Sequence, residues 1–322
     1  MATGSSLSQP PIALINFGNA YTKKYFTPKL PDSTFKPSPT LWSVMGTYAQ
    51  RVFGGGALVW GPVTAEETIG GAYWGTQVAD TTPQDTISPA ELQWRAYRQP
   101  IIVPVLDAKL NEGEGEVLNI FKTKEEIAMA SLLAKLSRAV YGVAPNNTSI
   151  DLDSWPSALA GSGSYAGVTI ATPWGSNGGG GPSSGGAISL DNMMVDYMNA
   201  TQGNEMPDRN FKTLLGYRAF WTLLTQQQRQ LGDDDVTRAG FKMHLMFNNA
   251  TVLYDSFVPA GEDYFITRKY AQGVFHPGDY FSVDPFTQPT DQRVLISWIY
   301  VTMNLRMLTL RQHSRRTGVT NA

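Results

Sequence analysis

One short motif in this sequence has the residue types of a serine hydrolase. Residues 181–185 read Gly-Pro-Ser-Ser-Gly and satisfy the G-x-S-x-G pattern, which would make Ser183 the nucleophile. In a nucleophile elbow the serine occupies the sharp turn that joins a strand directly to a helix. Here Pro173, Trp174 and five glycines separate the preceding apolar stretch from Ser183, and a glycine pair follows it. We therefore predict a flexible surface loop rather than a catalytic turn.

The same glycine-rich stretch lacks the groups that bind phosphate. A P-loop needs Lys and Ser or Thr after its second glycine, to reach the phosphates and the magnesium ion. Residues 174–189 contain no lysine. A dinucleotide-binding fingerprint needs a strand before its glycines and a helix after them within a βαβ unit, and the flanking pattern is different. We therefore expect the protein to use no cofactor.

Metal-ligating and acid–base side chains form no clear second constellation. The chain has no cysteine, which excludes disulfides, thiolate chemistry and cysteine-based zinc sites. Its histidines, His244, His276 and His313, show no metal-ligand spacing. Acidic groups at 66–67, 151/153 and 233–235 leave one enzymatic alternative open, a glycoside hydrolase that uses a carboxylate pair in an aromatic cleft. Our prediction is a protein that is not an enzyme and binds no metal.

The element that is clearest from the pattern is a long helix over residues 123–142. Thr123 and Glu126 have the spacing of a capping box, in which each side chain satisfies a free backbone donor. Apolar residues then recur on a 3.6-residue period. They are Met129, Leu132, Leu133, Leu136 and Val140. Gly142 supplies a left-handed end to the helix.

The rest of the chain alternates strands and shorter helices. Two further helices are predicted, one after Ser189 and one from about Asp208 to Gly232. Asn248-Asn249 predicts a hairpin turn between two strands. Predicted strands cover 57–63, 96–106, 242–247, 251–258, 263–270 and 293–308. Residues 1–50, which are rich in proline, are predicted to form an extended arm, and a long polar excursion is expected between the first two strands.

Composition and charge describe a globular protein with basic ends. Of 322 residues 42% are hydrophobic and 16% charged, which is far from the disordered regime, and the net charge is −2. Residues 1–50 carry four lysines against one acid, and residues 300–322 carry four arginines and no acid. We find no signal peptide, and the best membrane candidate, Val294 to Leu308, is short and contains Arg306. We expect a soluble protein that is intracellular when synthesised, with no membrane partner.

This order of elements resembles the HK97-type major capsid proteins of tailed bacteriophages. The long helix ends at Tyr141-Gly142 and is followed by Asp151-Leu152-Asp153. The Asn-rich turn leads to residues 258–264, Val-Pro-Ala-Gly-Glu-Asp-Tyr, and the chain closes with Asn304-Leu305-Arg306 and nearby arginines. The likeness extends over roughly residues 20 to 316.

The resemblance implies an α+β fold with the parts of an HK97-like capsid protein. These parts are an N-terminal arm, an E-loop β-hairpin, a long spine helix, a P-domain and an A-domain. The boundaries that we assign are 1–50 for the arm, 51–110 for the E-loop, 111–150 for the spine helix with part of the P-domain, 151–240 mainly for the A-domain, and 241–322 for the A-domain return, the P-domain strands and the basic tail.

The resemblance also implies the function of a structural protein. Copies of the chain would form the hexamers and pentamers of an icosahedral shell that encloses the phage DNA, inside a virion assembled in the host cytoplasm. Candidate contacts between subunits are Trp60, Tyr73, Trp74 and Trp94. Candidate DNA-facing residues are Lys23, Lys24, Arg311, Arg315 and Arg316. Implied partners are a portal protein, a separate scaffolding protein and a cementing protein.

Two departures from the family pattern constrain how the shell would be held together. Some members join an E-loop lysine to a neighbour's asparagine, but residues 51–99 contain no lysine, so we predict no such crosslink. The chain begins almost at once with the arm, so we expect any scaffolding segment to be a separate protein. Two alternatives to the phage capsid remain open beside the hydrolase. They are an encapsulin-type nanocompartment shell and a tail-tube or other virion subunit.

Overall fold

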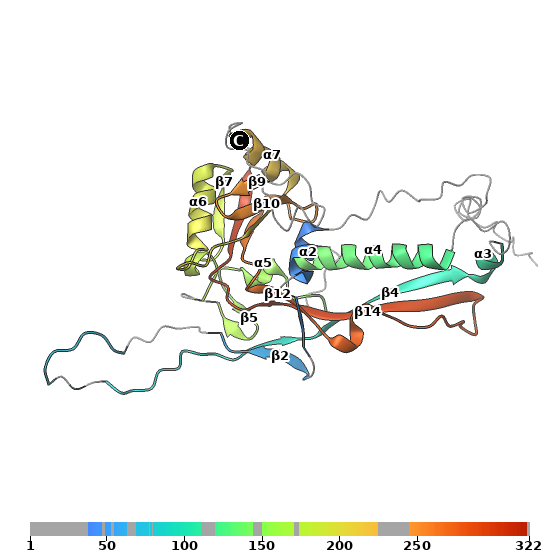
Figure 1. Cartoon of the computed structure of the whole chain (residues 1–322), viewed down its shortest axis with the longest axis horizontal. Coiled ribbons are helices and arrows are strands. Elements are labelled where there is room, and N and C mark those ends of the chain that lie inside the picture. Colours follow the sequence, from blue (N-terminus) through green and yellow to red (C-terminus); the bar gives the residue numbers. More distant parts are fainter. Residues whose placement is uncertain are drawn as a thin grey trace, which may run out of the picture. The chain divides into compact units, whose positions relative to one another are not determined.

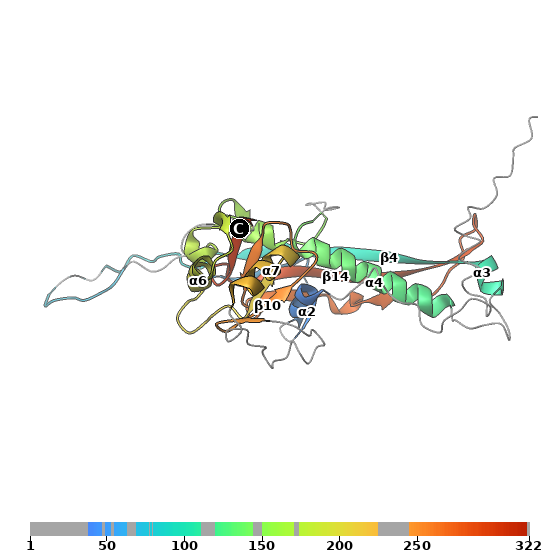
Figure 2. The same cartoon turned by 90° about the horizontal axis from the view of Figure 1, so that it is seen from above.

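The computed structural model describes residues 38–46, 49–52, 55–62, 69–76, 78, 80–110, 120–143, 150–170, 174–224 and 245–320 (Figures 1 and 2). The chain divides into two compact units. As far as the described residues go, unit 1 comprises Arg98–Leu132 and Phe281–Tyr300, and unit 2 comprises Pro37–Tyr97, Leu133–Tyr280 and Val301–Ala322. Residues of both units belong to three elements, β4 (Arg95–Pro104), α4 (Ile120–Val140) and β14 (Val294–Met307).

Unit 1 is small and built around β14. The short strand β13 (Ser282–Val283) pairs antiparallel with β14 through Ile299 and Tyr300. The helix α3 (Val105–Leu110) begins where the amide of Val105 donates to the carbonyl of Arg293 at 3.3 Å. Aromatic contacts complete this unit. The Phe121 and Phe286 rings meet edge to face at 5.2 Å, and the guanidinium of Arg98 lies 5.1 Å from the ring of Trp298.

Unit 2 is dominated by a six-stranded mixed sheet with the order β7-β15-β11-β8-β10-β9. Its strands are β7 (Ser183–Ala187), β8 (Arg209–Lys212), β9 (Leu245–Phe247), β10 (Ala250–Tyr254), β11 (Asp263–Ile266) and β15 (Ser314–Thr320). β11 pairs antiparallel with β15 and β8, whereas β8 pairs parallel with β10 and β15 pairs parallel with β7. Every residue of β8 and β11 is buried, as expected for central strands covered on both faces.

Two helices cover one face of this sheet. α6 (Leu190–Asn199) lies next to β15, and α7 (Leu214–Leu223) lies next to β8 and β10 (Figure 1). The hydroxyls of Ser189 and Thr213 cap the two helices by accepting from the amides of Asn192 and Gly216. The shared core is apolar and contains Met193, Tyr197, Phe220, Leu224, Leu245, Ala250, Val252 and Phe265. Ser189 thus confirms the predicted start of α6.

An aromatic cluster occupies the opposite face of the sheet. Successive residues of a strand point to opposite faces, so Tyr264 faces away from the core that contains Phe265. Tyr264 contacts Tyr141, which follows α4, with ring centroids 5.4 Å apart. Both rings also contact Trp155 of the short helix α5 (Trp155–Ala158), which packs on Phe211 of β8. This cluster fixes the end of α4 against the sheet of unit 2.

The long helix is confirmed, but its start was wrongly placed. α4 extends back to Ile120, so Thr123 is a buried helical residue and not a capping residue. Its end agrees with the prediction. Gly142 has φ +61°. Its backbone amide donates to the carbonyl of Ala139, and the backbone amide of Val143 donates to the carbonyl of Arg138. These two bonds make a Schellman motif, which ends the helix at a glycine.

A second sheet in the structure contains β1 (Gln50–Arg51), β12 (Ala271–Phe275), β14 and β13 in that order, with β4 also paired to β14. Two strand pairs lie outside both sheets. They are β2 (Ala57–Trp60) with β3 (Ala90–Gln93), and β5 (Ser164–Tyr165) with β6 (Val168–Thr169). Single turns of 3-10 helix are η1 (Asn177–Gly179) and η3 (Pro277–Asp279).

Three further predictions need correction. The proline-rich arm contains a helix, α2 (Pro39–Met45), because the hydroxyl of Ser38 caps it and Pro39 suits the first helical position. The helix predicted from Asp208 begins only at Leu214, and the strand β8 precedes it. The first predicted strand, β2, pairs with β3 and not with the longer β4. The Asn248-Asn249 hairpin is confirmed, with Phe247 opposite Ala250 and Asn248 at φ +51°.

Candidate functional site

Among the described residues, the most exposed apolar side chains belong to the excursion between β2 and β3, residues 61–89. Tyr73 is 80% exposed, Trp74 is 88% exposed and Val78 is 96% exposed. Burying a large aromatic side chain is worth on the order of 2 kcal/mol, so exposing several on one loop is unfavourable unless a partner covers them. Figure 1 shows the described, coloured parts of this segment extending away from β2. These three apolar side chains are exposed, in contrast to the two tryptophans at the base of the excursion.

The two tryptophans at the base of the excursion pack inside the subunit. Trp60, the last residue of β2, lies with its ring centroid 6.4 Å from that of Tyr165. Trp94 lies between the strands β3 and β4. It donates its indole N–H to the carbonyl of Gly55 at 3.3 Å, and its ring meets the His276 ring edge to face with centroids 5.5 Å apart. Both are half-buried. They hold the base of the excursion against the subunit, whereas Tyr73 and Trp74 are exposed to solvent.

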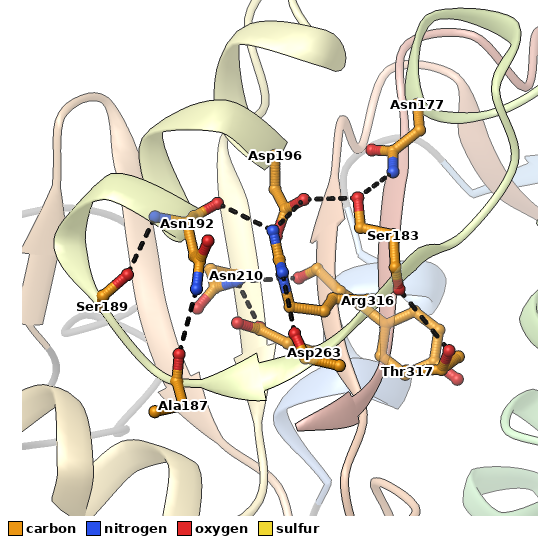
Figure 3. Close-up of polar contacts among 12 residues, drawn as sticks. Asn177, Ser183, Ala187, Ser189, Asn192, Asp196, Asn210, Asp263, Arg316 and Thr317 are labelled. Atoms are coloured by element: carbon orange, nitrogen blue, oxygen red, sulfur yellow. Dashed lines mark hydrogen bonds and ion pairs between the residues drawn. The ribbon is translucent and has the colours of Figure 1, made fainter. Parts of the chain in front are cut away.

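The glycine-rich stretch folds around a polar cluster, which we name the Arg316 cluster: Asn177, Ser183, Asp196 and Arg316 (Figure 3). Arg316 of β15 makes a bidentate ion pair with Asp196 of α6, with Nε–Oδ2 at 2.6 Å and Nη2–Oδ1 at 3.0 Å. The Ser183 hydroxyl donates to Asp196 Oδ1 at 2.7 Å and accepts from the amide of Asn177. The side chains of Arg316 and Asp196 are 11% and 2% exposed.

This cluster corrects the prediction of a flexible loop. Residues 183–187 form β7, which pairs with β15 from Arg316↔Ser183 to Thr320↔Ala187. The guanidinium of Arg316 also donates to the carbonyls of Gly185 and Asn192, both at 3.2 Å. A single buried cation therefore ties β7, β15 and α6 together. The partner strand β15 lies about 130 residues after β7 in the chain, so no local pattern in the sequence predicts that the two strands pair.

The geometry also excludes a serine nucleophile, although for a different reason than the one predicted. Ser183 begins a strand and is not at a strand-to-helix turn. A nucleophilic serine needs a neighbouring base that can take its proton. The hydroxyl's only ionisable partner within the described chain is Asp196, whose two carboxylate oxygens are already bound by Arg316. Ser183 is a structural residue.

Two of the arginines in the predicted DNA-facing set are engaged inside the subunit. Arg315 pairs with Glu262 at 2.6 Å and donates to the carbonyl of Pro156 at 3.0 Å. Arg316 belongs to the cluster above. Arg311 is half-buried and makes no ion pair with another described residue. Lys23 and Lys24 lie outside the described residues. Of the three arginines in the predicted set, only Arg311 is without an ion pair among the described residues.

The histidines and carboxylates that could have carried catalysis have structural partners. His313 is fully buried, its Nδ1 accepts from the amide of Thr267 at 3.2 Å, and burial lowers its pKa to about 3. Asp153 accepts from Asn304 at 2.6 Å, and Asp151 accepts from the hydroxyl of Tyr97 at 3.0 Å. His244 and the acidic groups at 66–67 and 233–235 lie outside the described residues.

Asn304 explains one part of the sequence resemblance. Its side chain is fully buried and donates both to Asp153 and, at 2.7 Å, to the carbonyl of Gln93. Its Oδ1 accepts from the amide of Asp153 at 3.2 Å. Asn304 thereby joins the return strand β14 to the root of the excursion and to the segment after α4. The sequence contains both motifs, Asn-Leu-Arg and Asp-Leu-Asp. Nothing in it indicates that Asn304 and Asp153 form a hydrogen bond with each other.

A second buried polar group lies between β8 and β11. Lys212 forms an ion pair with Asp263, its direct cross-strand neighbour, and Asn210 donates to the same carboxylate at 2.7 Å. A small, mainly apolar cavity of about 220 Å³ adjoins this pair at the start of α7. The charged side chains on its wall, Lys212, Asp263 and Glu262, are all in ion pairs. Among the described residues, no three His, Cys, Asp or Glu side chains gather as metal ligands would.

Comparison with known proteins identifies the fold. No protein-family model and no curated protein matches this sequence. Among solved structures, the capsid of cyanophage A-1(L) matches with a TM-score of 0.66 at 14% identity, over 91% of this chain and 96% of that chain. The major capsid protein of phage G matches with a TM-score of 0.53 at 10% identity, over 98% of this chain and 100% of that chain. This chain has the HK97 fold.

The same fold is shared by a protein of another kind. The SrpI encapsulin of Synechococcus elongatus matches with a TM-score of 0.58 at 12% identity, over 97% of this chain and 96% of that chain. The α+β, HK97-like fold predicted from the sequence is therefore confirmed. These structures were solved as capsid or encapsulin assemblies. None of the described helices has the length and apolarity needed to cross a bilayer.

Proposed function

We propose that this chain is the subunit of a closed icosahedral shell built from hexamers and pentamers of itself. The observation that carries the proposal is the extent of the HK97 likeness, which covers more than nine-tenths of this chain and of each capsid or encapsulin chain compared above. An isolated domain or a fold fragment would match only in part. The exposed apolar surface of unit 2 supports the same proposal, because it needs partners.

In this shell the β2–β3 excursion is the E-loop, and Tyr73 and Trp74 contact a neighbouring subunit. Their exposure of 80% and 88% supports this assignment. Trp60 and Trp94 then position the loop from inside the subunit rather than by direct contact across the interface. Aromatic side chains with few rotatable bonds suit such contacts, because little conformational entropy is lost when they are buried.

We further propose that the shell is a phage capsid and encloses double-stranded DNA. Support comes from the capsids of cyanophage A-1(L) and phage G among the matches and from the basic residues Lys23, Lys24 and Arg311. Arg315 and Arg316 contribute less to a DNA-facing surface, since their charges are neutralised by Glu262 and Asp196. A portal protein, a separate scaffolding protein and a cementing protein are the partners that such a capsid would use. The phage G structure includes a decoration protein.

The specific alternative is an encapsulin-type compartment, supported by the SrpI match. The first experiment is therefore to purify the chain after expression and measure assembly mass by light scattering, with negative-stain electron microscopy. Closed particles of megadalton size are expected. A stable species of one to four copies under several salt and pH conditions would contradict the shell. Nuclease-protected DNA inside particles from an infected or induced host would support the capsid, and a protein cargo without DNA would support the encapsulin.

A further inference from the structure

We infer that the exposed face of α6 on one copy of the chain binds the exposed face of α7 on the next copy, head to tail. This inference rests on the proposed shell function and specifies one of its contacts. Both helices cover the same face of the six-stranded sheet, and each leaves an apolar strip uncovered in the isolated subunit. The two strips differ in composition, and that difference determines which surface binds which.

The α6 strip is long and regular. Leu190, Met194 and Met198 follow one another at intervals of four residues, so they lie along one line of the helix surface. They are 36%, 43% and 57% exposed, and Val195 beside them is 47% exposed. The turn between β9 and β10 borders the strip, since the amide of Asn248 contacts the sulfur of Met194 at 3.4 Å. Flexible thioether side chains suit a surface that must fit a partner at more than one angle.

The α7 strip is shorter and lies at the beginning of its helix. Leu214 and Leu215 are 59% and 57% exposed, and Trp221 is 37% exposed. Leu214 and Trp221 are seven residues apart, so they share a helix face. The cavity of about 220 Å³ opens beside the two leucines. This strip therefore offers both protruding side chains and a recess next to them.

Each strip carries a single charge, and the two charges are opposite. Asp191 lies three and seven residues before Met194 and Met198, on the same face of α6. Arg218 lies between Leu214 and Trp221 on the face of α7. Both are exposed, and neither forms an ion pair within the part of the chain that the structure describes. A contact between α6 and α7 can bring these opposite charges together, whereas α6 on α6 or α7 on α7 offers each charge only a like charge.

The positions of the helices on the sheet favour a repeating contact. α6 lies next to β15, toward the β7 end of the strand order, and α7 lies next to β8 and β10, toward the β9 end (Figure 1). A copy that binds through its α7 strip keeps its own α6 strip available for another copy. Such a heterologous contact closes into a ring when the rotation between copies allows it. Further copies of this chain are thus the occupants of the two strips, one copy at each strip.

The absence of cysteine allows a direct test by cysteine crosslinking. In the full chain, Met194→Cys and Leu215→Cys are made singly and together, and assembled particles are treated with a short bis-maleimide. The double variant should give a ladder on a denaturing gel that ends at the pentamer and hexamer. Each single variant should stay monomeric on the same gel. Ser162→Cys, at an exposed site away from both strips, is the matched control and should also stay monomeric.

The other outcomes separate this inference from the proposed function. Particles that form normally but give no ladder with the double variant would overturn the α6–α7 contact and leave the shell proposal standing. Dimers from Met194→Cys alone would show an α6–α6 contact and overturn the head-to-tail arrangement. A wild-type chain that forms no particles and no multimers would overturn both.

A charge exchange gives independent confirmation. Asp191→Arg and Arg218→Asp should each lower the yield of particles by about tenfold, because each places like charges in the contact. The double variant restores opposite charges and should recover most of the yield. Circular dichroism of the unassembled subunits checks that the single variants fold. Equal yields from all three variants would argue against a contact between the two strips.

Discussion

Arg316 illustrates how a residue that is basic in sequence can be structural in the fold. Its guanidinium is buried, paired with Asp196 and bonded to two backbone carbonyls. The charge that suggested a nucleic-acid contact is therefore used to join three elements. A buried ion pair contributes little net stability as a whole, but removing one partner leaves the other charge buried without compensation.

The first prediction concerns this pair. Arg316→Met should lower the free energy of unfolding by about 3–5 kcal/mol, because Asp196 is left as an isolated buried carboxylate. The double variant Arg316→Met with Asp196→Leu should recover most of the loss. Denaturant unfolding of the unassembled subunit at neutral pH measures both. A single variant as stable as the wild type would mean that the pair is open to solvent.

The second prediction concerns His313 and acid. Burial lowers its pKa to about 3, whereas an unfolded histidine has a pKa of about 6.5. Between these values the unfolded chain binds the additional proton, so stability is fully present above pH 6.5 and is lost as the pH falls toward 3. The loss is at most ~1.4 kcal/mol per pH unit.

His313→Gln keeps a side chain that can accept a hydrogen bond but does not titrate. Unfolding measured from pH 7 to pH 4 should therefore show a shallower pH dependence for the variant than for the wild type. The carboxylates contribute equally to both proteins and cancel in the difference. Identical slopes would show that His313 is solvated in the folded subunit.

Among residues, sequence reasoning was most successful where a role is local. The left-handed Gly142 and the capping Ser189 were predicted because their signals lie within one helical turn of the position. The partners of Ser183 and Arg316 were not predicted, because they lie far apart in sequence. A G-x-S-x-G match identifies residue types. Only the fold shows whether a side chain that could act as a base lies next to the serine.

At the scale of elements, the glycine run in front of β7 provides a matched test. Gly181 has φ +75°, and a Cβ there would overlap the Cα of Gly161. Gly180 has φ −87°, and the atom nearest to a Cβ there is the carbonyl oxygen of Asn177 at an ordinary 3.8 Å. The two neighbouring glycines therefore differ in what they tolerate.

Gly181→Ala should destabilise the subunit by at least ~1–2 kcal/mol from the backbone conformation alone, with the overlap adding to it. Gly180→Ala should change stability by less than ~0.5 kcal/mol. Thermal unfolding of the two variants side by side distinguishes them. Similar stabilities would mean that this stretch is a flexible loop after all, as its composition suggests.

Elements were predictable where periodicity is strong and unpredictable where tertiary contacts decide. The 3.6-residue period of α4 and the Asn-Asn turn between β9 and β10 were sufficient by themselves. β8 was mistaken for the start of a helix because its sequence, Arg-Asn-Phe-Lys, has no alternation. It is a strand because it lies between β10 and β11, where even Asn210 and Lys212 find buried partners.

At the scale of the whole molecule, the excursion tip should matter for assembly and not for subunit stability. Replacing Tyr73 and Trp74 with alanine should change the free energy of unfolding by less than ~0.5 kcal/mol, since both side chains are exposed. The same variant should fail to form particles, or form them at a much higher protein concentration. Trp94→Ala is the contrasting control and should destabilise the subunit, because Trp94 packs on His276. Normal assembly of the tip variant would contradict the E-loop assignment.

The assembled shell should also come apart into single chains in denaturant. Residues 51–99 contain no lysine and the chain contains no cysteine, so neither the E-loop isopeptide bond nor a disulfide can join subunits. Boiled particles on a denaturing gel should run as one band at 35.2 kDa with and without reductant. A ladder of larger species would reveal a covalent bond of another kind.

The fold as a whole was recognisable from the order of elements rather than from any motif. A strand excursion, one long helix, a mixed middle and a long return strand describe the chain, and the comparison with capsids agrees at only 10–14% identity. At such low sequence identity the chains share the arrangement of helices and strands but not the individual side-chain contacts. That is why the surfaces of α6 and α7 could not be predicted as binding sites before their exposure was known.

The position of β15 in its sheet has a consequence for synthesis. β15 pairs with both β7 and β11, yet it follows every other strand of that sheet in the chain. Until the ribosome has released this segment, β7 has no partner and Asp196 has no arginine. A nascent chain therefore cannot complete unit 2, and its α6 surface cannot be presented in final form to another copy. This order would delay oligomerisation on polysomes until the segment that contains β15 has left the ribosome.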